Sequence, residues 1–206
     1  MHAYGAAFDN PDLIVACVVG DGEAETGPLA AGWHGNKFIN PTRDGAVLPI
    51  LHLNGYKIAG PTVFGRMSNE KITKFFEGCG HQVRIIEGDD PMTVHKALWE
   101  TLDWAYAEIR QIQQTAKTEG VKKAVDFPMI VLRTPKGWTG PKVVDGHKVE
   151  GTFRAHQVPL SDVIKNDAHF KMLEEWLRSY NPDKHFDAQG KPSAQVLSLV
   201  PKAKKR

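Results

Sequence analysis

The chain has 206 residues, of which 41% are hydrophobic and 24% charged, and these proportions exclude a disordered, collagen-like or low-complexity protein. No apolar run approaches the ~18 residues that a membrane-spanning helix needs. The net charge is +2, but four basic residues (Lys202, Lys204, Lys205 and Arg206) lie in the last five positions. The rest of the chain is therefore mildly acidic, and we expect neither a nucleic-acid-binding surface nor a membrane partner.

The basic end of the chain is expected to be solvated, although it could also bind an anionic partner. The two cysteines, Cys17 and Cys79, are too few for a disulfide framework. Because Cys17 lies in an apolar run, we expect a buried thiol in a reducing compartment, the cytoplasm. The N-terminus shows no basic region and no cleavage site, so no signal peptide is expected.

Short apolar runs alternate with helical stretches along the first two thirds of the chain. In chain order, the pattern predicts a buried strand at 13–19, a helix at 27–38, a strand at 47–53 (weakened by Pro49), a helix at 70–79, a strand at 82–86, a long helix at 91–117 and a strand at 127–132. The alternation predicts an α/β fold with a mainly parallel sheet and helices on both faces.

Two helices show a clear apolar face. In the long helix, residues recur at steps of three and four: Leu98, Leu102, Ala105, Ile109 and Ile112. A later helix at 170–180 is expected to turn Leu173, Trp176 and Leu177 inward. Between these helices, residues 135–159 are rich in Gly, Pro and Lys, and a loop of this length is usually functional or mobile. We therefore expect an α/β domain over residues 1–160 and a helical appendage and linker over 161–206.

The most informative stretch is GDGEAETGP, residues 20–28, which lies between a predicted strand and a predicted helix, where α/β sheets bind ligands. Gly20 and Gly22 permit a tight turn, and the N-terminus of the following helix suits a phosphate. Three acids, Asp21, Glu23 and Glu25, would repel a bare phosphate. The stretch therefore favours Mg²⁺ between carboxylate and phosphate.

Asn54 follows the next predicted strand, 33 positions after Asp21. If the two strands are parallel neighbours, Asn54 lies beside Asp21, and the carbonyl of Tyr56 can complete an oxygen shell around Mg²⁺. Taken alone, Asn54-Gly55 is more often only a turn. Its pairing with Asp21 favours the ligand interpretation.

Gly20-Asp21-Gly22 followed by Asn54 resembles the thiamine-diphosphate-binding motif of the thiamine-dependent enzymes, although Gly55 replaces the usual second asparagine. Longer segments resemble phosphoketolases and together cover essentially residues 2–200: HAYGAAFDNPDL, ACVVGDGEAETGPLAAGWHGNKFINP, PILHLNGYKIAGPT, TPKGWTGPK and EGTFRAHQVPL. Transketolases share the GDG triplet but not the GEAETGP continuation or the FRAHQVP segment.

The resemblance implies an enzyme that cleaves xylulose 5-phosphate, and often fructose 6-phosphate, with inorganic phosphate to acetyl phosphate and an aldose phosphate. The resemblance also implies that Mg²⁺ is held by Asp21, Asn54 and the carbonyl of Tyr56. It implies that the diphosphate of thiamine diphosphate is lined by Gly20, Gly22 and Glu23. His156 and Lys136 match the family's active-site histidine and lysine. A histidine suits the general acid that loss of hydroxide requires, and a lysine suits developing negative charge or phosphate.

In the family, a glutamate from a second, pyrimidine-binding domain reaches the cofactor across a homodimer interface, and nothing in this sequence offers that domain. We therefore expect a fragment of a longer enzyme, cut near His2 and in the basic tail, that is inactive alone. Two alternatives stay open: a transketolase-like thiamine enzyme, and a non-catalytic module that binds Mg²⁺ and a nucleotide.

Overall fold

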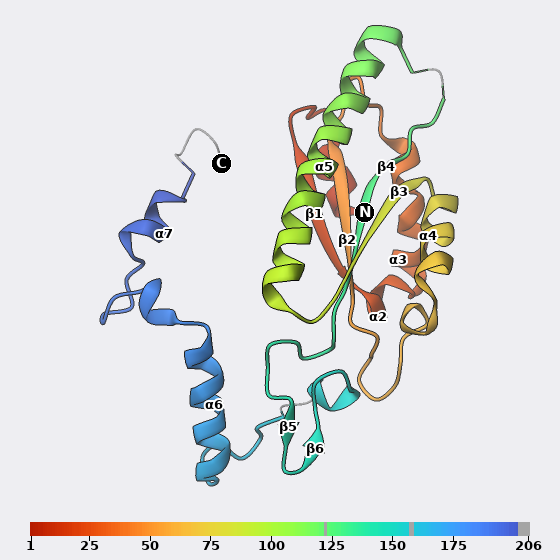
Figure 1. The fold of residues 1–206 in the computed structure, drawn as a ribbon. Coiled ribbons are helices and arrows are strands. Elements are labelled where there is room, and N and C mark those ends of the chain that lie inside the picture. Colours follow the sequence, from red (N-terminus) through yellow and green to blue (C-terminus); the bar gives the residue numbers. More distant parts are fainter. Residues whose placement is uncertain (122, 157–158, 202–206) are drawn as a thin grey trace.

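The computed structural model describes residues 1–121, 123–156 and 159–201. Its centre is a four-stranded parallel sheet in the order β1-β2-β4-β3, made of β1 (Ile14–Gly20), β2 (Ala46–Leu53), β3 (His81–Glu87) and β4 (Phe127–Arg133). The helices around it are α1 (His2–Ala7), α2 (Asp21–Ala24), α3 (Gly27–Gly32), α4 (Asn69–Gly78) and α5 (Pro91–Glu119) (Figure 1). The predicted α/β class is confirmed.

The side chains of β4 alternate between two cores. Ile130 packs in one cluster with Ile109 of α5, whereas Met129 and Val131 share a second cluster with Phe76 of α4. Because successive side chains of a strand point to opposite faces, α5 and α4 cover opposite faces of the sheet (Figure 1). The prediction of helices on both faces is confirmed.

The two longest helices of the α/β body begin at sequence signals for helix starts. The Ser68 hydroxyl accepts from the backbone N–H of Lys71 at the start of α4, and the Asp90 carboxylate accepts from that of Thr93 at the start of α5. Pro91 follows Asp90, where its missing N–H costs nothing. Hydrogen bonds from the side chain of Thr93 and from its backbone N–H lower the pKa of Asp90.

The register of the first two strands sets the position of the candidate ligands. β1 and β2 are parallel neighbours, and Gly20 pairs with His52. The chain therefore leaves both strands at the same edge of the sheet, with Asp21 after one and Asn54 after the other. The second strand forms in spite of Pro49, which has no backbone N–H to donate. β2 pairs with β4 only from Ile50 onward, so Pro49 lies outside that ladder of hydrogen bonds.

The prediction of a buried first strand is wrong in one respect. β1 lies at the edge of the sheet, and Val18, which shares a face with Ile50 and Ile130, is 68% exposed. The reason is that α5 packs on β3 and β4 and leaves this side of β1 uncovered. Cys17, whose side chain points to the opposite face from Val18, is only half-buried, Cys79 is buried, and both cysteines are free.

Two predicted inward positions are also wrong. On α5, Leu102 is exposed, because the helix approaches the sheet through the smaller Thr101 and Ala105. On the later helix α6 (Asp167–Ser179), Leu177 is exposed, and Met172 packs inward in its place.

Short helical segments depart from the pattern-based expectation, among them α2 and α7, which were not predicted. The six residues of α1 are too few to show a helical period, and this helix was not predicted. The predicted helix at 27–38 divides into α3 and a 3₁₀ segment, Trp33–Phe38.

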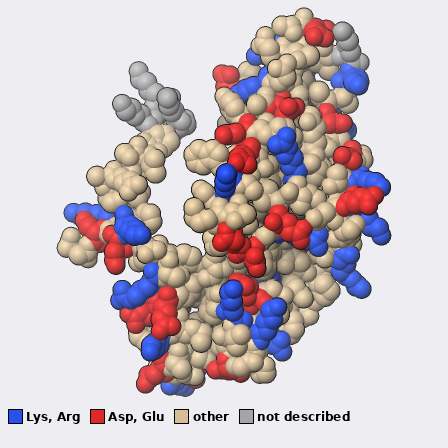
Figure 2. All heavy atoms as spheres, in the orientation of Figure 1, with Lys and Arg blue, Asp and Glu red and all other residues tan. Residues whose placement is uncertain are grey.

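The segment after β4 is largely irregular, as predicted, with a small hairpin of β5 (Val143–Val144) and β6 (His147–Lys148). Inward residues of α6 pack on Val144, Val149 and Leu160. The Nε2 atom of His169 on α6 contacts the Asp145 carboxylate at 3.0 Å. The C-terminal arm formed by α6 and α7 (Ala194–Ser198) extends away from the sheet, with a hollow between arm and body (Figure 2).

Some predictions are not tested by the described residues. Gln157 and Val158 of the FRAHQVP segment and the basic end (Lys202, Lys204, Lys205 and Arg206) lie outside them. The boundary between residues 160 and 161 stays a prediction. Within the described part of the chain, none of the helices combines the length and apolarity that crossing a bilayer requires.

His81 at the start of β3 links folding to pH. Its side chain is 2% exposed, and its Nε2 atom lies 3.2 Å from the carbonyl of Trp33. Burial lowers the pKa of His81 below its ordinary value of 6.5. The unfolded chain therefore takes up a proton below about pH 6.5 that the folded chain does not, and the free energy of unfolding falls as the pH drops.

We predict that the free energy of unfolding of His81→Gln falls less steeply between pH 7 and pH 5 than that of the unmodified chain. The difference in slope is up to about 1.4 kcal/mol per pH unit, which is the contribution of one proton. Urea denaturation at several pH values measures it. His185→Gln changes an exposed histidine and serves as the control. A pH dependence equal in His81→Gln and the unmodified chain would contradict the prediction.

Candidate functional site

The buried Asp21 carboxylate joins the ends of β1 and β2. Its side chain is 1% exposed. One oxygen accepts from the backbone N–H of Gly22 at 3.1 Å, and the other accepts from the backbone N–H of Gly55 at 2.7 Å and from the Thr62 hydroxyl at 2.8 Å. These three bonds replace the water that a buried carboxylate loses, and they hold the loop after β2 against the turn after β1. The predicted neighbourhood of the two strand ends is confirmed.

The loop after β2 depends on two glycines. Gly55 has φ +88°, which side-chain-bearing residues rarely adopt. A Cβ on Gly65 would lie 2.7 Å from the Cα of Gly55, so only glycine permits this approach. The Asn54 side-chain oxygen accepts from the backbone N–H of Tyr56 at 3.1 Å. Asn54-Gly55 is therefore a turn, and the same turn directs polar groups to the edge of the sheet.

The other two acids of the first loop behave differently from Asp21. Glu25 forms an ion pair with Lys57 and accepts from the backbone N–H of Val63 at 2.6 Å, so its charge is neutralised within the protein. The Glu23 carboxylate lies over Gly20, where a Cβ would collide with it. Among the ion pairs of the described residues, none involves Asp21.

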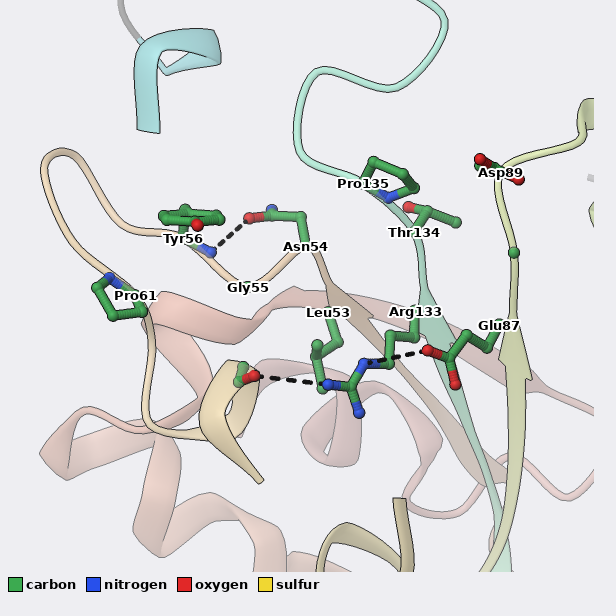
Figure 3. Close-up of a pocket in the computed structure, with 12 residues that line it drawn as sticks. Leu53, Asn54, Gly55, Tyr56, Pro61, Glu87, Asp89, Arg133, Thr134 and Pro135 are labelled. Atoms are coloured by element: carbon green, nitrogen blue, oxygen red, sulfur yellow. Dashed lines mark hydrogen bonds and ion pairs between the residues drawn. The ribbon is translucent and has the colours of Figure 1, made fainter. Parts of the chain in front are cut away.

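A cavity of about 410 Å³ opens at the carboxyl edge of the sheet. Loops from three strands line it: Asn54, Gly55 and Tyr56 after β2, Gly88 and Asp89 after β3, and Thr134 and Pro135 after β4 (Figure 3). Arg133 contributes to the floor, paired with Glu87 and hydrogen-bonded to the side chain of Asn69. This is the position where parallel α/β sheets bind ligands.

The structure brings Lys136 to the candidate ligand loop. Its Nζ atom donates to the carbonyl of Tyr56 at 2.8 Å. His156 is exposed, follows the 3₁₀ turn Phe153–Ala155, and is not among the residues that line the cavity. The segments that carry Lys136 and His156 still touch. Gly137 (φ +71°) lies so close to Ala155 that a Cβ on Gly137 would collide with the Ala155 side chain. The catalytic roles of Lys136 and His156 stay predictions.

The donor set fits Mg²⁺ by its chemistry. The candidates are a carboxylate (Asp21), an amide oxygen (Asn54) and a backbone carbonyl (Tyr56), all hard oxygen donors of the kind that Mg²⁺ prefers. In the described parts of the chain, no three His, Cys, Asp or Glu side chains gather as a metal site, so a softer metal finds no set of ligands there. The ammonium on the Tyr56 carbonyl shows that this oxygen already attracts a cation.

Sequence reasoning missed the residues that support the site. Thr62 is fully buried, donates to Asp21, and accepts from the backbone N–H of Gly65 at 2.9 Å. It lies in the NGYKIAGPT segment, but no periodicity or spacing signals a hydrogen bond over 41 positions. The pairing of Lys57 with Glu25 was missed for the same reason.

Fold and site together define an α/β ligand-binding domain with an oxygen-rich edge at the carboxyl ends of parallel strands. A family model described as "XFP N-terminal domain" matches residues 1–206, and the chain belongs to this family. The resemblance to phosphoketolases drawn from the motifs is thereby confirmed.

Curated relatives agree with this assignment. The chain is 60% identical over its whole length to a protein of Streptomyces avermitilis named "Probable phosphoketolase", and 61% identical to one of the same name from Bradyrhizobium diazoefficiens. A "Probable phosphoketolase 1" of a Nostoc species is 58% identical over 97% of this chain. The chain spans about a quarter of the length of these relatives (26%, 26% and 25%).

We predict that Thr62→Val lowers the free energy of unfolding by about 2–3 kcal/mol, because the substitution keeps the shape but removes a hydrogen bond to a buried carboxylate. Thr62→Ser keeps the hydroxyl and should lose less than half as much. Urea denaturation compares the two variants with the unmodified chain. Equal stability of Thr62→Val and Thr62→Ser would show that the hydroxyl does not support Asp21.

Proposed function

We propose that this chain is the part of a phosphoketolase that binds thiamine diphosphate and Mg²⁺. The whole enzyme is a cytoplasmic homodimer that cleaves xylulose 5-phosphate or fructose 6-phosphate with inorganic phosphate to acetyl phosphate and an aldose phosphate. A pyrimidine-binding domain outside this chain completes the active site.

The observation that carries the proposal is the bond from the Gly55 N–H to the buried Asp21 carboxylate. It joins the two halves of the thiamine-type motif, Gly20-Asp21-Gly22 and Asn54, at a single edge of the sheet. A hydrophobic core does not require a carboxylate at this place, whereas a cation-dependent ligand site does.

The residues of the chain have distinct tasks in this proposal. Asp21, Asn54 and the carbonyl of Tyr56 hold the cation, and the turn at Gly20 and Gly22 lets the diphosphate approach the backbone. Bound thiamine diphosphate supplies the electron sink for cleavage of the carbon–carbon bond.

Lys136 and His156 act on the substrate in the same proposal. Lys136 stabilises negative charge at phosphate or at the reacting oxygen. His156 donates the proton that accompanies loss of hydroxide. The contact between Gly137 and Ala155 supports this pairing of roles, because it holds the two segments together.

The names of the relatives support a phosphoketolase over a transketolase-like enzyme. The two reactions differ in the acceptor, which is phosphate in one and an aldose phosphate in the other. No observation favours the nucleotide-binding module, and ligand preference tests it directly.

We predict that calorimetry with Mg²⁺ present shows tighter binding of thiamine diphosphate than of ATP. Asn54→Ala should weaken the binding of thiamine diphosphate roughly tenfold or more, because even outer-shell partners of a metal are worth that much. Asp21→Asn should do the same, with circular dichroism to check the fold. Asp103→Asn changes an exposed carboxylate of α5 and should bind like the unmodified chain. A preference for ATP would favour the nucleotide-binding module.

We further predict that the 206-residue chain alone forms no acetyl phosphate from xylulose 5-phosphate and phosphate, because the glutamate that activates the cofactor lies in the second domain. The hydroxamate assay for acyl phosphates measures this, with a full-length phosphoketolase as the positive control. Turnover by the isolated chain would overturn the proposed division of the active site.

A further inference from the structure

The oxygen groups of the candidate metal site already have hydrogen-bond donors, and one of these donors carries a charge. Asp21 accepts from Gly22, Gly55 and Thr62, and Asn54 accepts from the N–H of Tyr56. All of these donors are neutral. Among the donors to these groups from described residues, only the Lys136 ammonium, on the carbonyl of Tyr56, is positive.

The backbone around Lys136 is held in place on three sides. The N–H of Thr134 donates to the carbonyl of Leu53, and the indole of Trp138 donates to the carbonyl of Asp89 at 2.8 Å. The carbonyl of Lys136 itself accepts from the N–H of Gly151 at 2.8 Å. Any movement of the ammonium must therefore come from its four-carbon side chain, which has the rotational freedom for it.

From this arrangement we infer that Lys136 is a place-holder for the divalent cation. Its ammonium occupies the Tyr56 carbonyl in the metal-free chain and leaves it when the cation binds. The inference rests on the proposed function, because it takes the Tyr56 carbonyl as a cation ligand. It adds that loading of the metal releases Lys136, so the active-site lysine becomes available to a substrate only in the loaded protein.

The physical reason is the competition of two positive charges for a single carbonyl. A divalent ion and an ammonium a few ångströms apart repel each other strongly in a partly buried site. The ammonium bond on the free carbonyl must also be broken before the cation takes that oxygen. Both effects weaken metal binding in the chain with Lys136 relative to a chain without it.

Metal affinity tests the inference. Mn²⁺ takes the same oxygen ligands as Mg²⁺, and loss of the electron paramagnetic resonance signal of free Mn²⁺ reports its binding. Lys136→Met should bind Mn²⁺ about tenfold more tightly than the unmodified chain, the effect expected of losing one charged hydrogen bond. Lys136→Arg keeps the charge and the donors and should stay close to the unmodified chain.

A matched control removes an exposed lysine elsewhere. Lys165→Met loses the same charge and should leave the Mn²⁺ affinity unchanged. Circular dichroism confirms that the variants remain folded.

Chemical labelling gives a second readout that does not depend on activity. The unmodified chain is acetylated with an N-hydroxysuccinimide ester, with and without Mn²⁺, and each lysine is quantified by mass spectrometry. Acetylation of Lys136 should rise several-fold when Mn²⁺ is added, relative to Lys165 as internal standard. The rise should be half complete at the Mn²⁺ concentration at which electron paramagnetic resonance shows half-maximal binding.

The outcomes separate the inference from the proposed function. If neither the unmodified chain nor Lys136→Met binds Mn²⁺, the proposed metal site is wrong. If both bind it with equal affinity, or if Mn²⁺ leaves the labelling of Lys136 unchanged, the place-holder role is overturned and the metal site stands.

Discussion

A single buried carboxylate organises the carboxyl edge of the sheet, where the candidate site lies. Asp21 has almost no contact with solvent, so its oxygens must find donors within the protein. Two of its three donors, Gly55 and Thr62, come from the loop after the neighbouring strand. The position of that loop is therefore set by a charge that cannot be left unsatisfied.

The parallel sheet brings further loops to the edge at which Asp21 lies. Because all four strands run in the same direction, the chain leaves each of them at the same edge, and loops after β2, β3 and β4 meet around the cavity. The apolar cores on both faces hold the strands in register, so polar loops at the edge keep their spacing. A stable, apolar body thus supports a polar site that does not have to stabilise itself.

The long segment after β4 belongs to this edge as well. Gly137 packs against Ala155, and the Lys136 carbonyl accepts from Gly151, so the two halves of the segment lie together without regular secondary structure. Through Lys136 the segment also reaches the Tyr56 carbonyl. The proposed cation site and Lys136 are in this way parts of one hydrogen-bonded network.

Much of the fold is contained in local patterns of the sequence. The four strands and the helices α4, α5 and α6 follow from apolar runs and helical periods. The position of Asp21 and of Asn54, each directly after a predicted strand, was enough to predict that both lie at the carboxyl edge. These features depend on residues close in the sequence, or on the simple rule that parallel strands end together.

Only the tertiary structure decided which strand lies at the sheet edge, that Thr101 and not Leu102 of α5 is buried, and what the ammonium of Lys136 contacts. Val18 is as apolar as its buried neighbours, and its exposure depends on where a helix 70 and more positions away crosses the sheet. The bonds from Thr62 to Asp21 and from Lys136 to Tyr56 join residues 41 and 80 positions apart. Such contacts arise from packing in three dimensions, because local chemistry sets which groups need partners but not which distant groups provide them.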